Sequence, residues 1–369
     1  MKLVFLCGSL EPGRDGVGDY TRRLAGELIR NDHHVLLIAL NDRAIENLID
    51  EEQESQGVFF PVLRLPETMP FKRRLLIARD KINNFNPEWI SLQYVPFSFQ
   101  KKGLPFGFAK QLKNLATNKK WHIMFHELWV GMNREASLKF KLWGTLQEKI
   151  INDTILLLNP ALINTQSRLH KSHLEEMGHQ VDLLPLFSNF EVVYKKQNRD
   201  GDPTLRFLVF GSIHPGAPFK AFAKELAGYG KSNNKKIHFT FLGKCARGLD
   251  EWVGSCEDYH FGIEILGEQE PEIVSEVMSK ADYGVSSTPY YLYEKSGTVV
   301  AMIEHKLPVL CVAAKFTPSV KVSLYPCEVT EYSPDQLDLD FVKNPSLSNS
   351  LEKTGRMFAE NLSLASSIN

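Results

Sequence analysis

Residues 1–40 read MKLVFLCGSLEPGRDGVGDYTRRLAGELIRNDHHVLLIAL, and this stretch decides the fold class. The apolar run Lys2 to Cys7 predicts a buried strand, which ends at a loop rich in glycine and charge. From Asp19 the apolar residues recur at helical spacing, and the run His34 to Leu40 predicts a second buried strand. Strand, glycine loop, helix and strand form a βαβ unit. The loop is therefore expected at the carboxyl edge of a parallel sheet, where such folds bind ligands.

The same alternation continues through the rest of the chain. In the first half it predicts helices at 72–85, 108–117, 136–152 and 167–177, and strands at 89–92, 121–125 and 161–165. Residues 194–204 are polar and rich in breakers, which favours a linker. A second series begins with a strand at 205 that runs into Gly211, and continues with helices at 219–228, 271–278 and 297–305 and strands at 237–242, 283–286 and 308–312. Residues 346–364 predict one more amphipathic helix.

Length and composition exclude several classes of protein. A chain of 369 residues exceeds the size of one hydrophobic core, so two domains are expected. A formal net charge of -1 gives no overall field that would attract nucleic acid. The apolar run at the N-terminus is too short for a signal peptide or a membrane span. Five cysteines without a CxxC pair favour free thiols in a reducing, cytoplasmic compartment: Cys7, Cys245, Cys256, Cys311 and Cys327.

Three segments place polar residues directly after predicted strands, and the first is the loop Gly13 to Gly18. Its glycines let backbone N–H groups approach a phosphate or a sugar, and the start of the following helix adds about half a positive charge. The alternative is a tight turn without a ligand, because the spacing does not match the dinucleotide pattern GxGxxG.

The second segment is FHELW, which sets His126 and Glu127 immediately after an apolar strand. Parallel strands end at one edge of a sheet, so we expect these residues beside the glycine loop. The alternative for a single histidine is a structural residue whose ring is satisfied inside the fold.

The third segment, residues 287–309, contains a strand end, a loop and the start of a helix. Ser296, Gly297 and Thr298 can offer backbone N–H groups to an anion. Glu294 can accept two hydrogen bonds from hydroxyl groups, each worth about 1.5–3 kcal/mol because the acceptor is charged. The alternative is that Glu294 caps the helix, although Ser296 stands nearer the cap position.

Four motifs together resemble one known family. GVGDYTRRLAGEL, FHELW, LPLFSNF and YEKSGTVVAMIEHKLPV follow the order found in the retaining GT-B glycosyltransferases of family 4, over nearly the whole chain. The resemblance implies an α/β fold of two Rossmann-like domains with parallel sheets facing across a cleft, and a C-terminal helix that returns to the first domain. The implied boundaries are 1–188 for the acceptor domain, 189–204 for a linker, 205–345 for the donor domain and 346–369 for the helix.

The resemblance also implies roles for single residues. Gly16 and Gly18 match a glycine loop near the donor diphosphate and the acceptor, and His126 matches a histidine that touches the donor sugar. Glu294 matches the first glutamate of a pair that holds hydroxyl groups of the transferred sugar. No metal is required in this family.

Two departures from the family pattern stand out. The second glutamate, which usually holds the ribose, falls at Ala301, so Glu304 is expected to reach the ribose instead. The arginine and lysine that usually hold the diphosphate are absent, because Ser212 and Ala217 occupy their loop. Lys220 and Lys244 are the expected substitutes.

We therefore predict a metal-independent transferase without a cofactor, which moves a sugar from a UDP- or GDP-linked donor to an acceptor with retention of configuration. The alternatives are an inactive binding or scaffolding subunit and a nucleotide-sugar epimerase. Basic segments starting near Phe71 and Leu138 allow peripheral contact with the inner membrane face, although an ordinary solvated helix is the favoured alternative for each. The predicted site residues are His126 and Glu294 for catalysis; Gly16, Gly18, Ser212, Lys220, Lys244, Ser296, Gly297, Thr298 and Glu304 for the donor; and Asp19, Tyr20, Tyr94, Glu127 and Trp129 for the acceptor.

Overall fold

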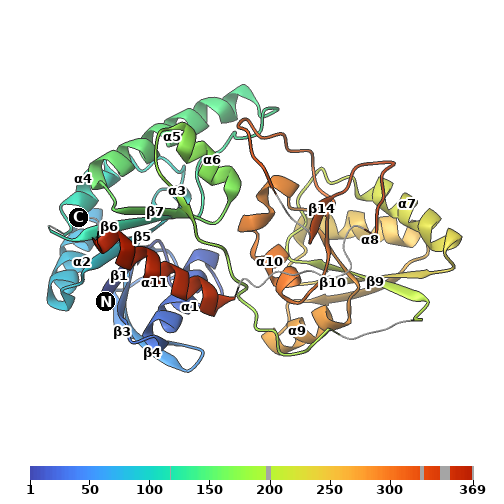
Figure 1. Cartoon of the computed structure of the whole chain (residues 1–369), viewed down its shortest axis with the longest axis horizontal. Coiled ribbons are helices and arrows are strands. Elements are labelled where there is room, and N and C mark those ends of the chain that lie inside the picture. Colours follow the sequence, from blue (N-terminus) through green and yellow to red (C-terminus); the bar gives the residue numbers. More distant parts are fainter. Residues whose placement is uncertain (117, 197–200, 325–327, 341–349, 368–369) are drawn as a thin grey trace. The chain divides into compact units, whose positions relative to one another are not determined.

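The computed structural model describes residues 1–116, 118–196, 201–324, 328–340 and 350–367, and the chain forms two compact units (Figure 1). The first unit comprises Met1–Pro185, Pro318–Val322 and Leu351–Asn369, and the second comprises Leu186–Thr317 and Ser323–Ser350. Parts of the predicted linker (197–200), donor domain (325–327, with Cys327, and 341–345) and C-terminal helix (346–349, 368–369) lie outside the described residues.

The first unit is built on an eight-stranded sheet with the order β3-β4-β2-β1-β5-β6-β7-β8. Its strands are β1 Lys2–Cys7, β2 His34–Asp42, β3 Ile49–Ser55, β4 Val58–Pro66, β5 Trp89–Tyr94, β6 Lys120–Phe125, β7 Leu162–Thr165 and β8 Asp182–Leu183. All neighbours pair in parallel except β3 and β4, which form an antiparallel hairpin. Its helices are α1 Gly16–Arg30, α2 Phe71–Phe85, α3 Pro96–Phe99, α4 Phe108–Lys113, α5 Leu138–Leu158, α6 Arg168–Glu176 and α11 Leu351–Ser367.

The second unit has a six-stranded, all-parallel sheet with the order β11-β10-β9-β12-β13-β14. Its strands are β9 Thr204–Phe210, β10 Lys236–Leu242, β11 Gly262–Gly267, β12 Tyr283–Ser286, β13 Val309–Cys311 and β14 Val329–Glu331. Its helices are α7 Phe219–Ser232, α8 Leu249–Asp258, α9 Pro271–Lys280 and α10 Gly297–Glu304, with short 3-10 helices η1 Ala246–Gly248 and η2 Tyr290–Lys295.

Both sheets follow the doubly wound strand order, in which the chain moves outward from the first strand in one direction and then returns to its other side. In the first unit β1 lies between β2 and β5, and in the second unit β9 lies between β10 and β12. The predicted fold class of two α/β domains with parallel sheets is confirmed. Each unit therefore offers a ligand position where its central strands end.

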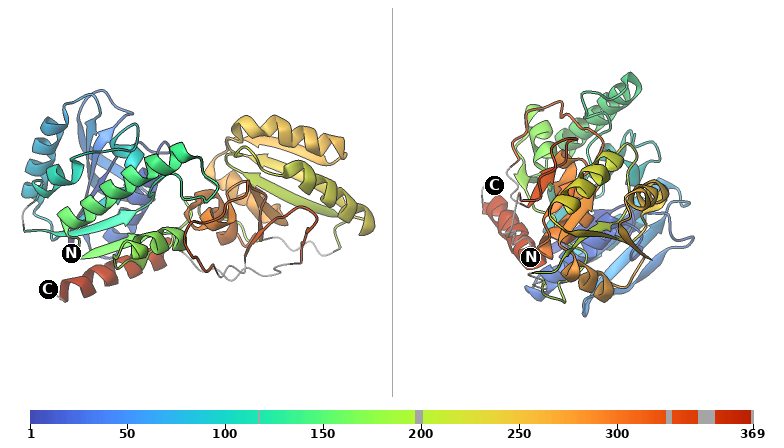
Figure 2. Two further views of the ribbon diagram at one scale, coloured as in Figure 1. Left: turned by 90° about the horizontal axis from the view of Figure 1, so that it is seen from above. Right: turned by 90° about the vertical axis from the view of Figure 1, so that its right-hand side faces the viewer.

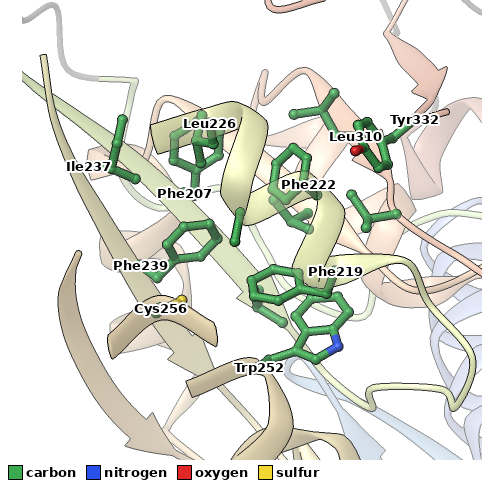
Figure 3. Packing of buried hydrophobic residues seen from close by; sticks show 14 of the residues in the cluster. Phe207, Phe219, Phe222, Leu226, Ile237, Phe239, Trp252, Cys256, Leu310 and Tyr332 are labelled. Atoms are coloured by element: carbon green, nitrogen blue, oxygen red, sulfur yellow. The ribbon is translucent and has the colours of Figure 1, made fainter. Parts of the chain in front are cut away.

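Aromatic packing holds α7 and α8 against the second sheet (Figure 3). The rings of Phe219 and Trp252 stack at a centroid distance of 4.0 Å and an interplanar angle of 8°. Phe219 and Phe222 from α7 are buried against Phe207 and Phe239 of the central strands. Because α7 begins after the loop that leaves β9, this packing fixes where that loop runs.

The C-terminal helix α11 lies along the first unit, beside α1 (Figures 1 and 2), as expected. Phe358 of α11 is buried against the rings of Phe5 and His122. Gly355 allows a close approach, because a Cβ atom there would lie 2.7 Å from the Cγ of Glu27 on α1.

Several elements of the fold are not predicted from the sequence, including the short strands β8 and β14 and the short helix α3. In the hairpin of β3 and β4, β3, IDEEQES, is a largely exposed edge strand without an apolar run, whereas β4, VFFPVLRLP, is largely buried and was overlooked despite its apolar residues. Helix α8 and strand β11 were also missed, and β11 is likewise a largely exposed strand at the edge of its sheet. The four described cysteines, Cys7, Cys245, Cys256 and Cys311, are buried free thiols.

We predict that Phe222→Ala lowers the free energy of unfolding by about 3–5 kcal/mol, because it empties a fully buried ring site. Ile265→Ala, which trims an exposed side chain of the same unit, is the control and should change it by less than about 0.5 kcal/mol. Urea denaturation measures both. Equal effects of the two substitutions would contradict this description of the core.

Candidate functional site

The end of β9 and the start of α10 touch at the carboxyl edge of the second sheet. Gly211, which follows β9, has φ +84°, a backbone conformation that favours glycine. A Cβ atom added there would lie 2.6 Å from the Cγ2 of Thr298 in α10. The structure thus brings together the two segments from which we predicted donor contacts, at the point where the strand order reverses.

Hydroxyl groups connect the loops at this edge. The Ser287 hydroxyl, after β12, accepts a hydrogen bond from the His214 N–H at 2.8 Å and donates one to the Ser212 carbonyl at 3.2 Å. The Thr288 hydroxyl donates to the Ser296 Oγ at 3.3 Å, and Thr298 Oγ1 lies 3.1 Å from the same atom. The loops that follow β9 and β12 are therefore joined by neutral groups.

The N-terminus of α10 has a neutral cap. Ser296 is the N-cap residue, and its hydroxyl accepts from the Val299 N–H at 3.5 Å. The first turn of α10 contains no acidic residue. The partial positive charge of the helix end is therefore not offset by a carboxylate within this turn, which suits an anion. Ser296 holds the N-cap position, and Glu294 lies in η2, two residues before it.

The two predicted substitute cations occupy different surroundings. Lys220 is an exposed residue in the first turn of α7. Lys244 follows β10 and forms a 3.0 Å ion pair with Glu268, with both side chains largely exposed. An exposed pair of this kind is weak, so Lys244 can exchange Glu268 for another anion at small cost.

Glu304 does not occupy the position predicted for a ribose contact. It is the last residue of α10, roughly 10 Å along the helix axis from Gly297. Its Oε1 accepts a hydrogen bond from the Ser188 N–H at 2.9 Å. The carboxylate therefore ties the segment LPLFSNF to the far end of α10. Ala301, at the position of the family's second glutamate, is buried.

The helix end that follows β1 in the first unit carries two carboxylates. Asp15 caps α1, and its Oδ1 accepts from the Gly18 N–H at 2.7 Å. Asp19 in the first turn accepts from the Gly13 N–H at 3.0 Å and from Arg22 at 3.2 Å. Burial raises the pKa of both carboxyl groups, and repulsion from Asp19 adds to the shift of Asp15. A diphosphate here would meet existing negative charge.

Gly16 and Gly18, which we predicted as donor contacts, lie beside these carboxylates. Gly18 is required for packing, because a Cβ atom there would lie 2.7 Å from the Ser9 carbonyl oxygen. Gly16 faces open space and is exposed. Carboxylates accept hydrogen bonds from hydroxyl groups, so this loop fits a sugar or an alcohol better than a phosphate.

His126 is buried between two amide side chains. Its Nε2 lies 2.8 Å from the Gln93 Oε1, and its Nδ1 lies 3.0 Å from the Gln166 Nε2. Gln93 accepts and Gln166 donates, so the ring is neutral with its proton on Nε2. Burial lowers the pKa of His126 to about 3. Both ring nitrogens of His126 are therefore engaged in hydrogen bonds inside the first unit. This corrects the prediction that the ring touches a donor sugar, because the ring instead holds the edge of the sheet in place.

This contact belongs to a longer buried network that the sequence analysis missed. Gln93 also donates to the Ser91 hydroxyl at 2.7 Å, which lies 2.8 Å from His122 Nδ1. His122 Nε2 lies 3.0 Å from the Asn164 Oδ1. The sequence signal was a polar residue inside each of three apolar strands, β5, β6 and β7. Each polar group is paired, as burial requires.

The predicted acceptor residues divide into two groups. Asp19, Glu127 and Trp129 are half-buried at the carboxyl edge of the first sheet. Tyr20 and Tyr94 are buried, which contradicts direct contact with an acceptor. The Tyr20 ring packs edge-on against His126 at 4.9 Å, so α1 and the end of β6 do meet as predicted. The ring of Tyr94 packs on Phe99 and Phe125 in the core.

Two absences characterise the described part of the chain. There, no group of three or more His, Cys, Asp or Glu residues is arranged to hold a metal ion. None of the described helices combines the length and the apolar character needed to cross a bilayer.

Comparison with known proteins identifies the fold. No family model and no curated protein matches the sequence. Among solved structures, Anabaena Alr3699/HepE in complex with UDP and glucose is 14% identical, with a TM-score of 0.59 over 98% of this chain and 99% of that one. Neisseria meningitidis UDP-GlcNAc 2-epimerase bound to UDP-GlcNAc is 10% identical, with a TM-score of 0.57 over 98% and 99%. The catalytic domain of Arabidopsis thaliana Starch Synthase IV, bound to ADP and acarbose, is 10% identical, with a TM-score of 0.54 over 100% and 99%. The chain therefore has the GT-B fold.

The buried His126 predicts a dependence of stability on pH. Its pKa is lowered in the folded state, so below pH ~6.5 the unfolded chain binds a proton that the folded chain excludes, and the free energy of unfolding falls toward pH ~3. His126→Gln should reduce this slope by up to about 1.4 kcal/mol per pH unit between pH ~6 and ~4. Urea denaturation along a pH series measures it, with the exposed His34→Gln as control. An unchanged slope in His126→Gln would contradict the neutral, buried ring.

Proposed function

We propose that this protein transfers a sugar from a nucleotide-diphosphate donor, UDP- or GDP-linked, to an acceptor hydroxyl with retention of configuration and without a metal ion or other cofactor. The observation that carries the proposal is the neutral, hydroxyl-lined edge of the second sheet, where Gly211 meets the serine-capped start of α10. The two units have the strand order whose reversal point binds nucleotides.

The donor is assigned to the second unit. Its diphosphate docks at the N-terminus of α10, and the negative charge that builds up on the leaving group is stabilised by this helix end and by Lys220 or Lys244. Glu294 accepts hydrogen bonds from hydroxyl groups of the transferred sugar. Ser212, Ser296 and Thr298 supply neutral hydrogen-bonding groups around the phosphates.

The acceptor is assigned to the first unit, whose acidic helix end fits hydroxyl groups. Asp19 and Glu127 accept hydrogen bonds from the acceptor, and Trp129 offers an apolar face beside them. His126 is a positioning residue that acts through Gln93 and Gln166. A departing phosphate oxygen takes the acceptor proton on the face from which the leaving group departs, so the new bond forms with retention. The rate comes from orientation and from stabilised charge.

Two other functions use the same fold. An epimerase would change the sugar of the nucleotide donor without an acceptor, and the Neisseria meningitidis epimerase covers 98% of this chain. An inactive binding subunit would hold the nucleotide sugar without turning it over. We propose a cytoplasmic location for the transferase, since the four described thiols are free.

Product analysis separates these functions. With a panel of UDP- and GDP-sugars and candidate acceptors, we expect free nucleoside diphosphate and a new glycoside with the anomeric configuration of the donor, unaffected by EDTA. Glu294→Gln should lower turnover by about 10²-fold, because it removes charge from the sugar contact. Mass spectrometry and NMR of the products measure both. An epimerised nucleotide sugar, or binding without any product, would replace the transferase assignment.

A matched pair of substitutions tests which helix end holds the diphosphate. Gly297 and Gly16 are each the first residue of their helix, exposed, with no atom within 4 Å of an added Cβ. An aspartate at the first position of a helix is compatible with folding but repels a diphosphate. Gly297→Asp should weaken UDP or GDP binding at least tenfold in calorimetric titration, whereas Gly16→Asp should change it by less than about twofold. The reverse pattern would assign the diphosphate to the first unit.

A further inference from the structure

Helix α5 carries a stripe of large apolar side chains that no other part of the described chain covers. Leu138, Leu142 and Leu146 are 72%, 62% and 47% exposed. They are spaced four residues apart, so they stand on one face of the helix. Three exposed leucines in a row are unusual on a surface that meets only water, and such patches mark binding surfaces.

Lysines flank this stripe. At 100° per residue, Lys139 and Lys141 project on opposite sides of Leu138, and both are exposed. Among the described residues neither of them forms an ion pair. The Trp143 indole donates to the Lys102 carbonyl at 2.9 Å, which sets the exposed Lys102 beside the same end of α5. The leucines are thus bordered by positive charge.

The opposite face of α5 is fixed to the first unit, so the exposure of the leucines is a property of the folded state. Gly144 packs so closely that a Cβ atom there would lie 2.1 Å from the Val130 carbonyl oxygen. Gln147 accepts from the Val130 N–H at 2.9 Å and donates to the Gly103 carbonyl at 3.1 Å. These contacts hold the leucine stripe outward.

We propose that this lysine-bordered leucine stripe is a docking surface for an anionic lipid bilayer. The leucines enter the boundary between headgroups and acyl chains, while Lys139, Lys141 and Lys102 meet lipid phosphates. The positive charge of these lysines favours an anionic membrane over a second copy of the chain. A second copy bound about a twofold axis would bring the same lysines against each other, whereas an anionic membrane is attracted by all of them. The proposal does not rest on the transferase assignment.

The second basic helix, α2, does not share this arrangement. Its Arg74 is buried and donates to the Asn41 Oδ1 at 2.6 Å and to the Met69 carbonyl at 2.9 Å. Arg74, one of the central charges of α2, therefore stabilises the fold of the first unit. The proposal is confined to α5.

Vesicle sedimentation tests the proposal with the full-length chain. Binding is expected to phosphatidylcholine vesicles that contain about one third phosphatidylglycerol, and it should weaken as salt is raised. Lys139→Gln with Lys141→Gln should weaken it about twenty-fivefold, or about fivefold for each charge removed. Leu138→Ser with Leu142→Ser should weaken it at least tenfold. The matched control is Leu364→Ser, because Leu364 is 64% exposed in the same unit but belongs to α11 and not to α5; it should bind like the unchanged protein.

Three results would overturn the proposal. They are absence of binding at low salt, equal binding to vesicles without phosphatidylglycerol, and an equal loss in Leu364→Ser. Sedimentation equilibrium tests whether a second copy of the chain binds to the stripe instead. A dimer that the Leu138 and Leu142 substitutions abolish would assign the stripe to that second copy. Nucleotide binding in the absence of vesicles should be unchanged in every variant, so a failure here is distinguishable from a failure of the transferase assignment.

Discussion

The charge of the residue that caps a helix determines what the end of that helix can bind, and this constraint separates the roles of the two units. Both units place a helix start after a central strand of a parallel sheet. In the first unit a carboxylate, Asp15, occupies the cap and Asp19 follows in the first turn. In the second unit the cap is the hydroxyl of Ser296, and the first turn of α10 has no acidic residue. A helix end already compensated by carboxylates suits hydroxyl groups, whereas one that is capped by a neutral group suits a phosphate. The proposed division into acceptor and donor sides follows from this difference.

Satisfied polar groups inside the first sheet hold its functional edge in place. His126 is bonded at both ring nitrogens, and the chain of hydrogen bonds continues through Gln93 to Ser91 and His122. A buried polar group that lost its partner would cost about 1–3 kcal/mol, so each member restrains the next. For the proposed transfer this rigidity matters because such a reaction depends on orientation, and a carboxylate or an indole at a loosely held edge would not align an acceptor.

Much of the fold was accessible from sequence because buried parallel strands are continuous apolar runs. The ranges of β1 and β12 were predicted without error, and most helices were placed within a few residues. The charged edge strand β3 was not predicted, because a strand without an apolar face shows no periodic pattern of apolar residues. At the candidate site the sequence predicted that His126 lies at the same sheet edge as the glycine loop, and His126 contacts Tyr20 in the helix that follows this loop. It could not foresee that Glu304 turns toward Ser188, because the direction of a side chain depends on neighbours distant in sequence.

Amide hydrogen exchange with and without saturating UDP tests the central claim most directly, because it reports on each backbone N–H group that a diphosphate would cover. If the serine-capped helix end holds the diphosphate, exchange should slow in peptides spanning residues 210–214 and 295–300, while residues 13–18 keep their rates. Protection confined to residues 13–18, or absent from both helix starts under saturating nucleotide, would contradict the account.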